Sequence, residues 1–194
     1  MMKSDSIMIS SEIGLPLRQQ EIFRGLLDAF SYPGRVTICA EQNTPAWLAI
    51  LSALVDGESA LADPGELLPA AIWQTLETRR ATPESAAYLL LDGSKAPEIQ
   101  PNLGTLEAPE GGATILLIVT SLGNVNAEGL CLKLSGPGIK ETTILAVEGL
   151  HPAWIEARNE WVSAFPIGAE IILSDANKFV ALPRSTRIDF EGGA

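Results

Sequence analysis

Two apolar segments near the C-terminus are joined by only three residues, and this short link strongly constrains the fold. Residues 165–174 and 178–186 flank the tripeptide Asp-Ala-Asn at residues 175–177. Parallel strands need a crossover of about a dozen residues or more, whereas antiparallel strands can close through a tight turn. The two segments therefore predict a buried antiparallel hairpin with a proline-glycine entry and a Leu-Pro-Arg-Ser-Thr exit at residues 182–186.

Elsewhere the apolar residues recur at helical spacing or form short strand-like runs. Expected helices occupy residues 18–30, 46–55, part of 67–80 and 151–163, and expected strands occupy residues 35–39, 87–91, 113–120, 129–135 and 142–147. Helices that lie between apolar strands indicate a layered α/β fold, and the closing hairpin makes its sheet mixed. The sequence predicts a single-domain α/β/α arrangement over residues 1–194, with an irregular arm at 1–17 and a long loop at 92–112.

Two helix features give specific expectations. Thr44 and Pro45 fit a hydroxyl N-cap followed by proline at the first helical position. Trp154 and Trp161 lie seven residues apart and are expected to share the inner side of their helix. Aromatic side chains are enriched at interfaces, so all four tryptophans are also candidate interface anchors, although core packing is favoured for two of them. The four are Trp47, Trp73, Trp154 and Trp161, and core packing is favoured for Trp47 and Trp154.

The charge balance excludes one class of partner. The chain has 13 Lys and Arg residues against 24 Asp and Glu residues, a net charge of −11, which disfavours nucleic acid. An anionic ligand would need a local cluster of donors. The apolar runs are shorter than the roughly 20 residues of a membrane span, and the N-terminus lacks a signal-peptide core, so a cytoplasmic protein is expected. Cys39 and Cys131 are expected to be buried free thiols rather than a disulfide.

Catalytic groups are scarce. His151 precedes a proline at a helix start, where a capping or surface role is favoured over a catalytic one. With one histidine, a Ser-His-Asp arrangement has only this residue to build on. The sequence contains neither a G-x-S-x-G motif nor a Cys/His cluster with zinc spacing. From the residues alone, the catalytic residues stay unassigned and no metal site is expected.

A few polar segments are candidates for ligand binding. The Gly-Pro-Gly turn within residues 135–139 could direct backbone N–H groups at a phosphate, although a structural turn is favoured. The Arg-Ser-Thr sequence at 184–186 could hold a phosphate or a carboxylate, with a structural or interface role as the alternative. The candidate ligand-binding residues are Arg24, Gly136, Gly138, Arg184, Ser185 and Thr186.

Five short blocks form an ordered set between about residues 15 and 190. They are Phe23-Arg24 with Leu27 and Ser31-Tyr32-Pro33-Gly34; Leu54-Val55-Asp56; Pro109-Glu110-Gly111-Gly112-Ala113-Thr114; Leu134-Ser135-Gly136-Pro137-Gly138-Ile139; and Phe165-Pro166-Ile167-Gly168 through Leu182-Pro183-Arg184-Ser185-Thr186. The order and spacing of these blocks resemble the H subunit of the bacterial carbon–phosphorus lyase system.

This resemblance implies a function in organophosphonate catabolism. The implied step makes α-D-ribose 1-methylphosphonate 5-triphosphate from a nucleoside triphosphate and methylphosphonate. The resemblance also implies a homodimer, partnership with the other subunits of the core complex, and a fold like the large domain of pyridoxal-phosphate-dependent transferases without the cofactor. The lysines, at positions 3, 95, 133, 140 and 178, stand in no recognisable Schiff-base motif.

Three hypotheses remain open at this point. The chain is an accessory, non-catalytic subunit of that complex, which fits both the blocks and the scarcity of acid–base groups. Alternatively, it binds a nucleoside triphosphate or a phosphonate directly and contributes catalytic groups. The third hypothesis, a freestanding pyridoxal-phosphate enzyme, rests on fold analogy alone.

Overall fold

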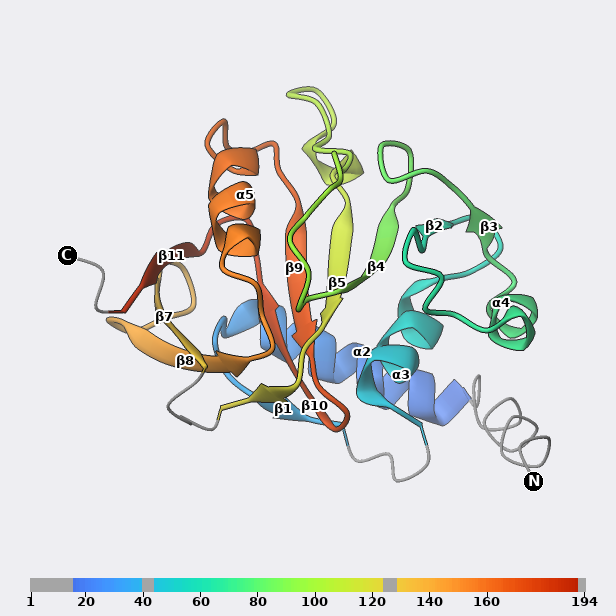
Figure 1. Ribbon diagram of the computed structural model, residues 1–194, viewed down its shortest axis with the longest axis horizontal. Coiled ribbons are helices and arrows are strands. Elements are labelled where there is room, and N and C mark those ends of the chain that lie inside the picture. The colour runs from blue at the N-terminus through green and yellow to red at the C-terminus, as the bar shows by residue number, and fades with distance from the viewer. Residues whose placement is uncertain (1–15, 40–43, 124–128, 192–194) are drawn as a thin grey trace.

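A large mixed β-sheet forms the centre of the molecule (Figure 1). The structure is a computed structural model that describes residues 16–39, 44–123 and 129–191. Within these residues the sheet has seven strands, in the order β1 (Thr37–Ile38), β10 (Lys178–Leu182), β9 (Glu170–Ser174), β5 (Thr114–Ile118), β4 (Tyr88–Asp92), β2 (Ala60–Ala62) and β3 (Arg79–Arg80). β9, β5, β4, β2 and β3 run parallel, and β10 runs antiparallel to both of its neighbours. The predicted mixed sheet is confirmed.

The closing hairpin is the pair β9–β10, as the three-residue link predicts. Val180 pairs with Leu173, and residues 175–177 form the connection. The two strands are antiparallel and each has a second neighbour in the sheet, so the hairpin lies inside the sheet rather than at its edge.

The middle strands are apolar because both faces of the sheet are covered. On β5, the adjacent residues Leu116 and Leu117 point to opposite faces, yet their exposed fractions are only 2% and 0%. Strands buried on both sides carry nearly continuous apolar runs rather than alternating ones. This explains why residues 113–120 could be identified as a buried strand from the sequence, although the strand is shorter than predicted.

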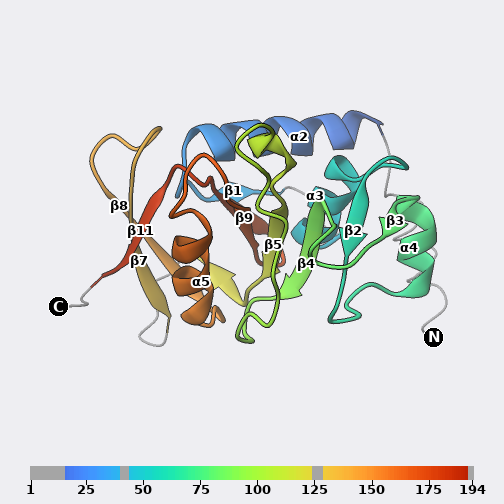
Figure 2. The ribbon, with the colours of Figure 1, turned by 90° about the horizontal axis from the view of Figure 1, so that it is seen from above.

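Helices cover one face of this sheet, whereas a helix and a second sheet cover the other (Figure 2). α2 (Pro16–Ser31), α3 (Ala46–Leu54) and α4 (Ala70–Leu76) share one hydrophobic core with the strands. α5 (Ala153–Trp161) packs on the opposite face, in a core shared with the smaller sheet. The layered α/β prediction is therefore confirmed, and the structure adds a small antiparallel sheet that the predicted α/β/α arrangement did not include.

The smaller sheet is antiparallel throughout. Its order is β11 (Arg187–Phe190), β7 (Leu130–Ser135), β8 (Thr143–Glu148) and β6 (Ser121–Leu122). β7 lies within the strand predicted at residues 129–135 and alternates, with Leu132 and Leu134 buried and Lys133 exposed between them. β7 and β8 correspond to strands predicted at residues 129–135 and 142–147, whereas their partners β6 and β11 were not predicted.

Several local expectations need correction. Helix α2 begins at Pro16, inside the arm predicted for residues 1–17, and residues 1–15 lie outside the described part. Thr44 makes no side-chain cap for α3: its buried Oγ1 has no hydrogen-bond partner among the described residues, and Pro45 is the capping residue. Trp161 is only 6% exposed and packs in the core, so it is no surface anchor.

The long loop at residues 92–112 is not wholly irregular. It ends in a 3-10 helix at Pro109–Gly111, and Leu103 forms an antiparallel bridge with Gly112. This ordering brings the Gly-Gly pair at residues 111–112 beside the closing hairpin, where Gly112 contacts the site described below.

The remaining expectations concern the thiols and the membrane. Neither cysteine is in a disulfide, and only Cys39 is buried, since Cys131 is half-buried on β7. Among the described residues, no helix combines the length and the apolar character that crossing a bilayer requires.

Candidate functional site

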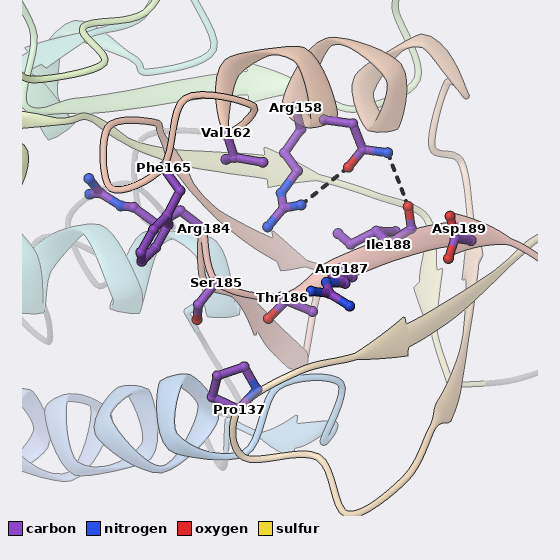
Figure 3. Close-up of a pocket in the computed structure, with 11 residues that line it drawn as sticks. Pro137, Arg158, Val162, Phe165, Arg184, Ser185, Thr186, Arg187, Ile188 and Asp189 are labelled. Carbon is purple, nitrogen blue, oxygen red and sulfur yellow. Dashed lines mark hydrogen bonds between the residues drawn. The ribbon is translucent and has the colours of Figure 1, made fainter.

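A pocket of about 620 Å³ opens between α5, the segment after β10 and the start of β11 (Figure 3). This volume lies within the range of small-molecule sites. Its lining residues are Pro137, Arg158, Asn159, Val162, Phe165, Arg184, Ser185, Thr186, Arg187, Ile188 and Asp189. Three of the six predicted ligand-binding residues, at positions 184–186, are therefore brought together here.

Core packing of α5 positions one wall of the pocket. Trp154 and Trp161 contact each other edge to face, with ring centroids 6.4 Å apart. The indole N–H of Trp154 donates to the Lys95 carbonyl at 2.7 Å, which holds the helix to the loop after β4. Arg158 lies one turn after Trp154, so the same packing turns its side chain inward.

Arg184 joins three distant segments of the chain. Its Nε donates to Glu170 Oε1 at 2.6 Å, and its backbone N–H donates to Glu170 Oε2 at 2.6 Å. Its Nη1 donates to the carbonyls of Pro109 and Pro166, at 2.6 and 3.1 Å. The guanidinium therefore connects β9, the 3-10 helix and the Phe-Pro entry of the hairpin, and Figure 3 shows it directed away from Arg158 and Thr186. Its observed contacts are structural.

The glycine at position 112 allows this close assembly. A Cβ on Gly112 would collide with the Gly168 carbonyl oxygen and would lie 3.2 Å from Arg184 Nη1. Only a residue without a side chain fits between those groups. The Gly-Gly block and the Phe-Pro-x-Gly block are thus parts of one structural junction around Arg184.

Arg158 has a different environment, because its charge is buried and forms no ion pair with the described residues. The residue is 1% exposed, and burial lowers the pKa of its guanidinium to about 10, partly offset by the charge of Glu170. Nη2 donates to the Pro183 carbonyl at 2.7 Å and Nη1 donates to Asn159 Oδ1 at 3.2 Å. Nε has no partner in the described part of the chain. At neutral pH the group is still protonated.

Two hydroxyl groups face Arg158 across the pocket. Thr186 is 2% exposed, and its buried Oγ1 has no hydrogen-bond partner among the described residues. Ser185 beside it is half-buried. Figure 3 shows the Arg158 guanidinium pointing from α5 toward the segment that carries Thr186. A cation and an unsatisfied hydroxyl therefore border the same space.

Asn159 connects the two walls. Its Oδ1 accepts the hydrogen bond from Arg158, and its Nδ2 donates to the Ile188 carbonyl at 3.0 Å (dashed lines in Figure 3). This bridge fixes the distance between α5 and β11, so the pocket is preformed. The outer rim carries the exposed side chains of Arg187 and Asp189.

The Gly-Pro-Gly turn supports the pocket from below. Gly136 has φ +130°, and a Cβ there would lie 2.9 Å from the Ser185 carbonyl oxygen. Gly138 has φ +81°, and a Cβ there would collide with the Ser31 carbonyl oxygen. Neither glycine lines this pocket, although Pro137 between them does. The turn packs between the end of α2 and the 184–186 segment. This agrees with the structural role that the sequence favoured for it.

Two other predicted residues lie elsewhere. Arg24 is exposed on α2 and does not line the pocket. His151 is exposed, and its Nδ1 accepts a hydrogen bond from the Ala153 N–H at 3.2 Å, which agrees with the predicted capping or surface role. The described residues contain no group of three or more His, Cys, Asp or Glu side chains that could hold a metal ion.

Sequence reasoning missed Arg158, Asn159 and Arg187. A signal existed for Arg158, because it follows Trp154 by four residues and precedes Trp161 by three, which places a charge on the apolar stripe of the helix. Asn159 and Arg187 carry no comparable signal, since both belong to ordinary polar surroundings in the sequence.

The sequence is similar to known proteins over almost its whole length. Residues 15–189 match the family described as bacterial phosphonate metabolism protein (PhnH). The putative C-P lyase subunit protein HtxG of Stutzerimonas stutzeri is 43% identical over 175 residues, which cover 90% of this chain and 88% of that protein.

A second relative is the alpha-D-ribose 1-methylphosphonate 5-triphosphate synthase subunit PhnH of Rhizobium meliloti (strain 1021). It is 27% identical over 185 residues, which cover 89% of this chain and 90% of that protein. These matches confirm the resemblance carried by the five blocks. The chain therefore belongs to the PhnH family of bacterial phosphonate metabolism proteins.

Proposed function

We propose that this chain is the PhnH-type subunit of the complex that makes α-D-ribose 1-methylphosphonate 5-triphosphate in phosphonate catabolism. We further propose that its role there is accessory, in assembly and positioning, rather than catalytic on its own. The observation that carries the proposal is the family match over residues 15–189, which extends over nearly the full length of both relatives.

The chemistry of the described residues supports an accessory role. Arg184, the most suggestive polar residue in the sequence, directs its observed hydrogen bonds to Glu170 and to backbone carbonyls. His151 accepts a backbone hydrogen bond at the start of α5. General acid–base catalysis needs a titratable group within reach of the reacting atoms, and the pocket lining offers Asp189 as its sole carboxylate among the described residues.

We also infer a distant relationship to the large domain of pyridoxal-phosphate-dependent transferases, without the cofactor. The mainly parallel seven-stranded sheet between two covering layers supports it. Lys178 is engaged at the end of the hairpin, where its Nζ donates to the Leu122 carbonyl at 3.1 Å, so it is poorly placed for a Schiff base. In a titration with pyridoxal phosphate, the visible absorption of the protein–cofactor mixture should equal the summed absorption of the protein and the cofactor measured separately.

A cytoplasmic homodimer is the form that we propose for the subunit outside the complex. Its support is an exposed apolar surface on and after α2, where Phe23, Leu27 and Tyr32 are 47%, 54% and 52% exposed. Phe23 and Leu27 lie one helical turn apart and therefore face the same way. Apolar side chains gathered on one helix face are typical of an interface.

Affinity capture from phosphonate-grown cells tests the proposed membership. A tagged copy of the full chain should retain the other subunits of the phosphonate-processing complex, identified by mass spectrometry. Cells that express the tag on an unrelated protein serve as the control. Recovery of the tagged chain with none of those subunits, under conditions in which the pathway is induced, would contradict the proposal.

A further inference from the structure

We propose that the pocket between α5 and β11 is a binding site for a tetrahedral oxyanion, the phosphate group of a nucleotide or the phosphonate group of an organophosphonate, held by Arg158 and Thr186. The choice of ligand class rests on the proposed function, whereas the need for an anion follows from the pocket itself. Binding at this site requires no catalysis by the chain.

The buried charge of Arg158 has no ion-pair partner among the described residues. A guanidinium carries five N–H donors, and two acceptors in the described residues, the Pro183 carbonyl and Asn159 Oδ1, are within hydrogen-bonding distance. No carboxylate of the described residues forms an ion pair with it. Buried charges in proteins are normally paired, because an uncompensated charge in the interior is strongly unfavourable. An anion in the pocket would supply the missing partner.

The hydroxyl of Thr186 also borders the pocket without a partner among the described residues. Its Oγ1 is buried and has no partner in the described part of the chain, although nearly all buried polar groups in native proteins have one. A hydroxyl can donate to an anionic oxygen while the guanidinium donates to another oxygen of the same group. The half-buried Ser185 adds a second hydroxyl beside it. Two independent unsatisfied groups therefore border one space.

The local charge favours an anion although the chain is strongly acidic. Glu170 already pairs with Arg184, which leaves Arg158 and Arg187 against Asp189 in the lining. The pocket thus has a positive excess within a chain of net charge −11. Such a local exception to the overall field is what an acidic protein needs in order to bind an anionic ligand.

The orientation of Arg158 also favours a ligand-binding role over a purely structural one. Its two hydrogen bonds to Pro183 and Asn159 leave Nε free among the described residues, and Figure 3 shows the guanidinium directed into the pocket rather than along the sheet. Arg184 likewise bonds through two of its three nitrogens, Nε and Nη1, but one of its acceptors is the Glu170 carboxylate, whereas Arg158 has no carboxylate acceptor among the described residues. The arrangement is incomplete without a ligand.

Isothermal titration of the full chain tests this site with three probes: inorganic phosphate, methylphosphonate and magnesium ATP. Equal binding of phosphate and methylphosphonate assigns the pocket to the oxyanion group itself. Binding of methylphosphonate alone assigns it to the phosphonate, and binding of ATP alone assigns it to the nucleotide triphosphate. Each result supports the site, provided that binding depends on Arg158.

Two variants establish that dependence. Arg158→Met should weaken binding by more than about tenfold, because a charge-assisted hydrogen-bond partner is lost. Its melting temperature without ligand should stay equal or rise, since an unpaired buried charge is removed. Thr186→Val keeps the shape and should also weaken binding by about tenfold. Arg79→Met, which removes one exposed charge from β3 at the far end of the large sheet (Figure 1), is the matched control and should bind normally.

The outcomes separate this proposal from the proposed function. Loss of binding in Arg158→Met, with capture of the other complex subunits intact, supports both. The anion site is overturned if none of the three probes binds, or if they bind equally to Arg158→Met and Arg79→Met. It is also overturned if Arg158→Met instead abolishes subunit capture while no probe binds, because the partner of Arg158 would then be a carboxylate of another protein. Failure of capture for the unaltered chain would contradict the proposed function alone.

Discussion

Arg184 and Arg158 illustrate two uses of the same side chain within one small region. Arg184 is 13% exposed in its side chain and pairs with Glu170, whose side chain is 20% exposed, so the pair is largely removed from water. Its remaining donors bond to backbone carbonyls of segments far apart in sequence. Arg158 is more deeply buried and has no carboxylate partner within the described residues. Arg184 therefore stabilises the fold, whereas Arg158 retains an N–H donor with which it can bind a ligand.

The structural role of Arg184 leads to a stability prediction. Arg184→Met should lower the free energy of unfolding by about 3 kcal/mol, because it leaves a mostly buried Glu170 carboxylate without its cation. Urea unfolding followed by tryptophan fluorescence measures the change. Arg35→Met, at an exposed arginine, is the control and should change stability by less than about 0.5 kcal/mol. Similar losses in the two variants would show that Arg184 does not hold the junction.

Gly138 gives a second prediction about stability. Gly138→Ala should lower the free energy of unfolding by at least about 2 kcal/mol, because the residue has φ +81° and its Cβ would collide with the Ser31 carbonyl. Gly65→Ala is the matched control, since a Cβ added to that glycine would make only ordinary contacts and the residue has no positive φ. Thermal unfolding of both variants gives the comparison, and equal melting temperatures would contradict the assigned role of the turn.

The hairpin connection is the element that joins the two sheets. Asp175 is 7% exposed, and its Oδ1 accepts hydrogen bonds from the backbone N–H groups of Asn177 and Lys178 at 2.8 and 2.7 Å. Its Oδ2 accepts the Leu122 N–H of β6 at 3.0 Å. One carboxylate therefore closes the turn of the larger sheet and fastens the first strand of the smaller one.

These two functions of Asp175 can be separated by substitution. Asp175→Asn can keep its carbonyl oxygen at the turn but loses the acceptor for Leu122, so we expect a loss of about 1 kcal/mol. Asp175→Ala loses all three hydrogen bonds and should cost about 3 kcal/mol. Amide hydrogen exchange locates the effect: in Asp175→Asn the Leu122 amide should exchange faster while the Lys178 amide stays protected. Equal acceleration at both amides would show that the two contacts are not independent.

Across the chain as a whole, the correctly predicted elements are those that short-range sequence patterns determine. The three-residue link determined the antiparallel β9–β10 pair, and continuous apolar runs located the buried strands. β11 escaped prediction because it has only four residues, Arg187–Phe190, and because its partners, Ser135–Leu132, lie 52 to 58 positions earlier in the chain. Such pairing has no local signature. The sequence likewise predicted only part of the pocket lining, because the tertiary fold brings α5 and β11 together.

The proposed dimer is a property of the whole molecule, and α2 offers a direct test. Leu27→Lys should convert the particle from twice the 20.6 kDa chain mass to a single chain, because a charge would be placed within the exposed apolar surface. Light scattering after size-exclusion chromatography measures the mass. Leu106→Lys, at a leucine that is 71% exposed in the long loop, is the control and should leave the mass unchanged. A dimer that persists in Leu27→Lys would place the interface elsewhere.

The position of β11 after the closing hairpin has a consequence for synthesis on the ribosome. Every strand of the larger sheet ends by Leu182, whereas the pocket wall that faces α5 is formed by Ser185, Thr186 and the strand that follows them. The ribosome therefore makes the residues of the main sheet before it makes those of the polar wall. The capacity to hold an anion would appear only once β11 has docked on β7, after every strand of the larger sheet has been made.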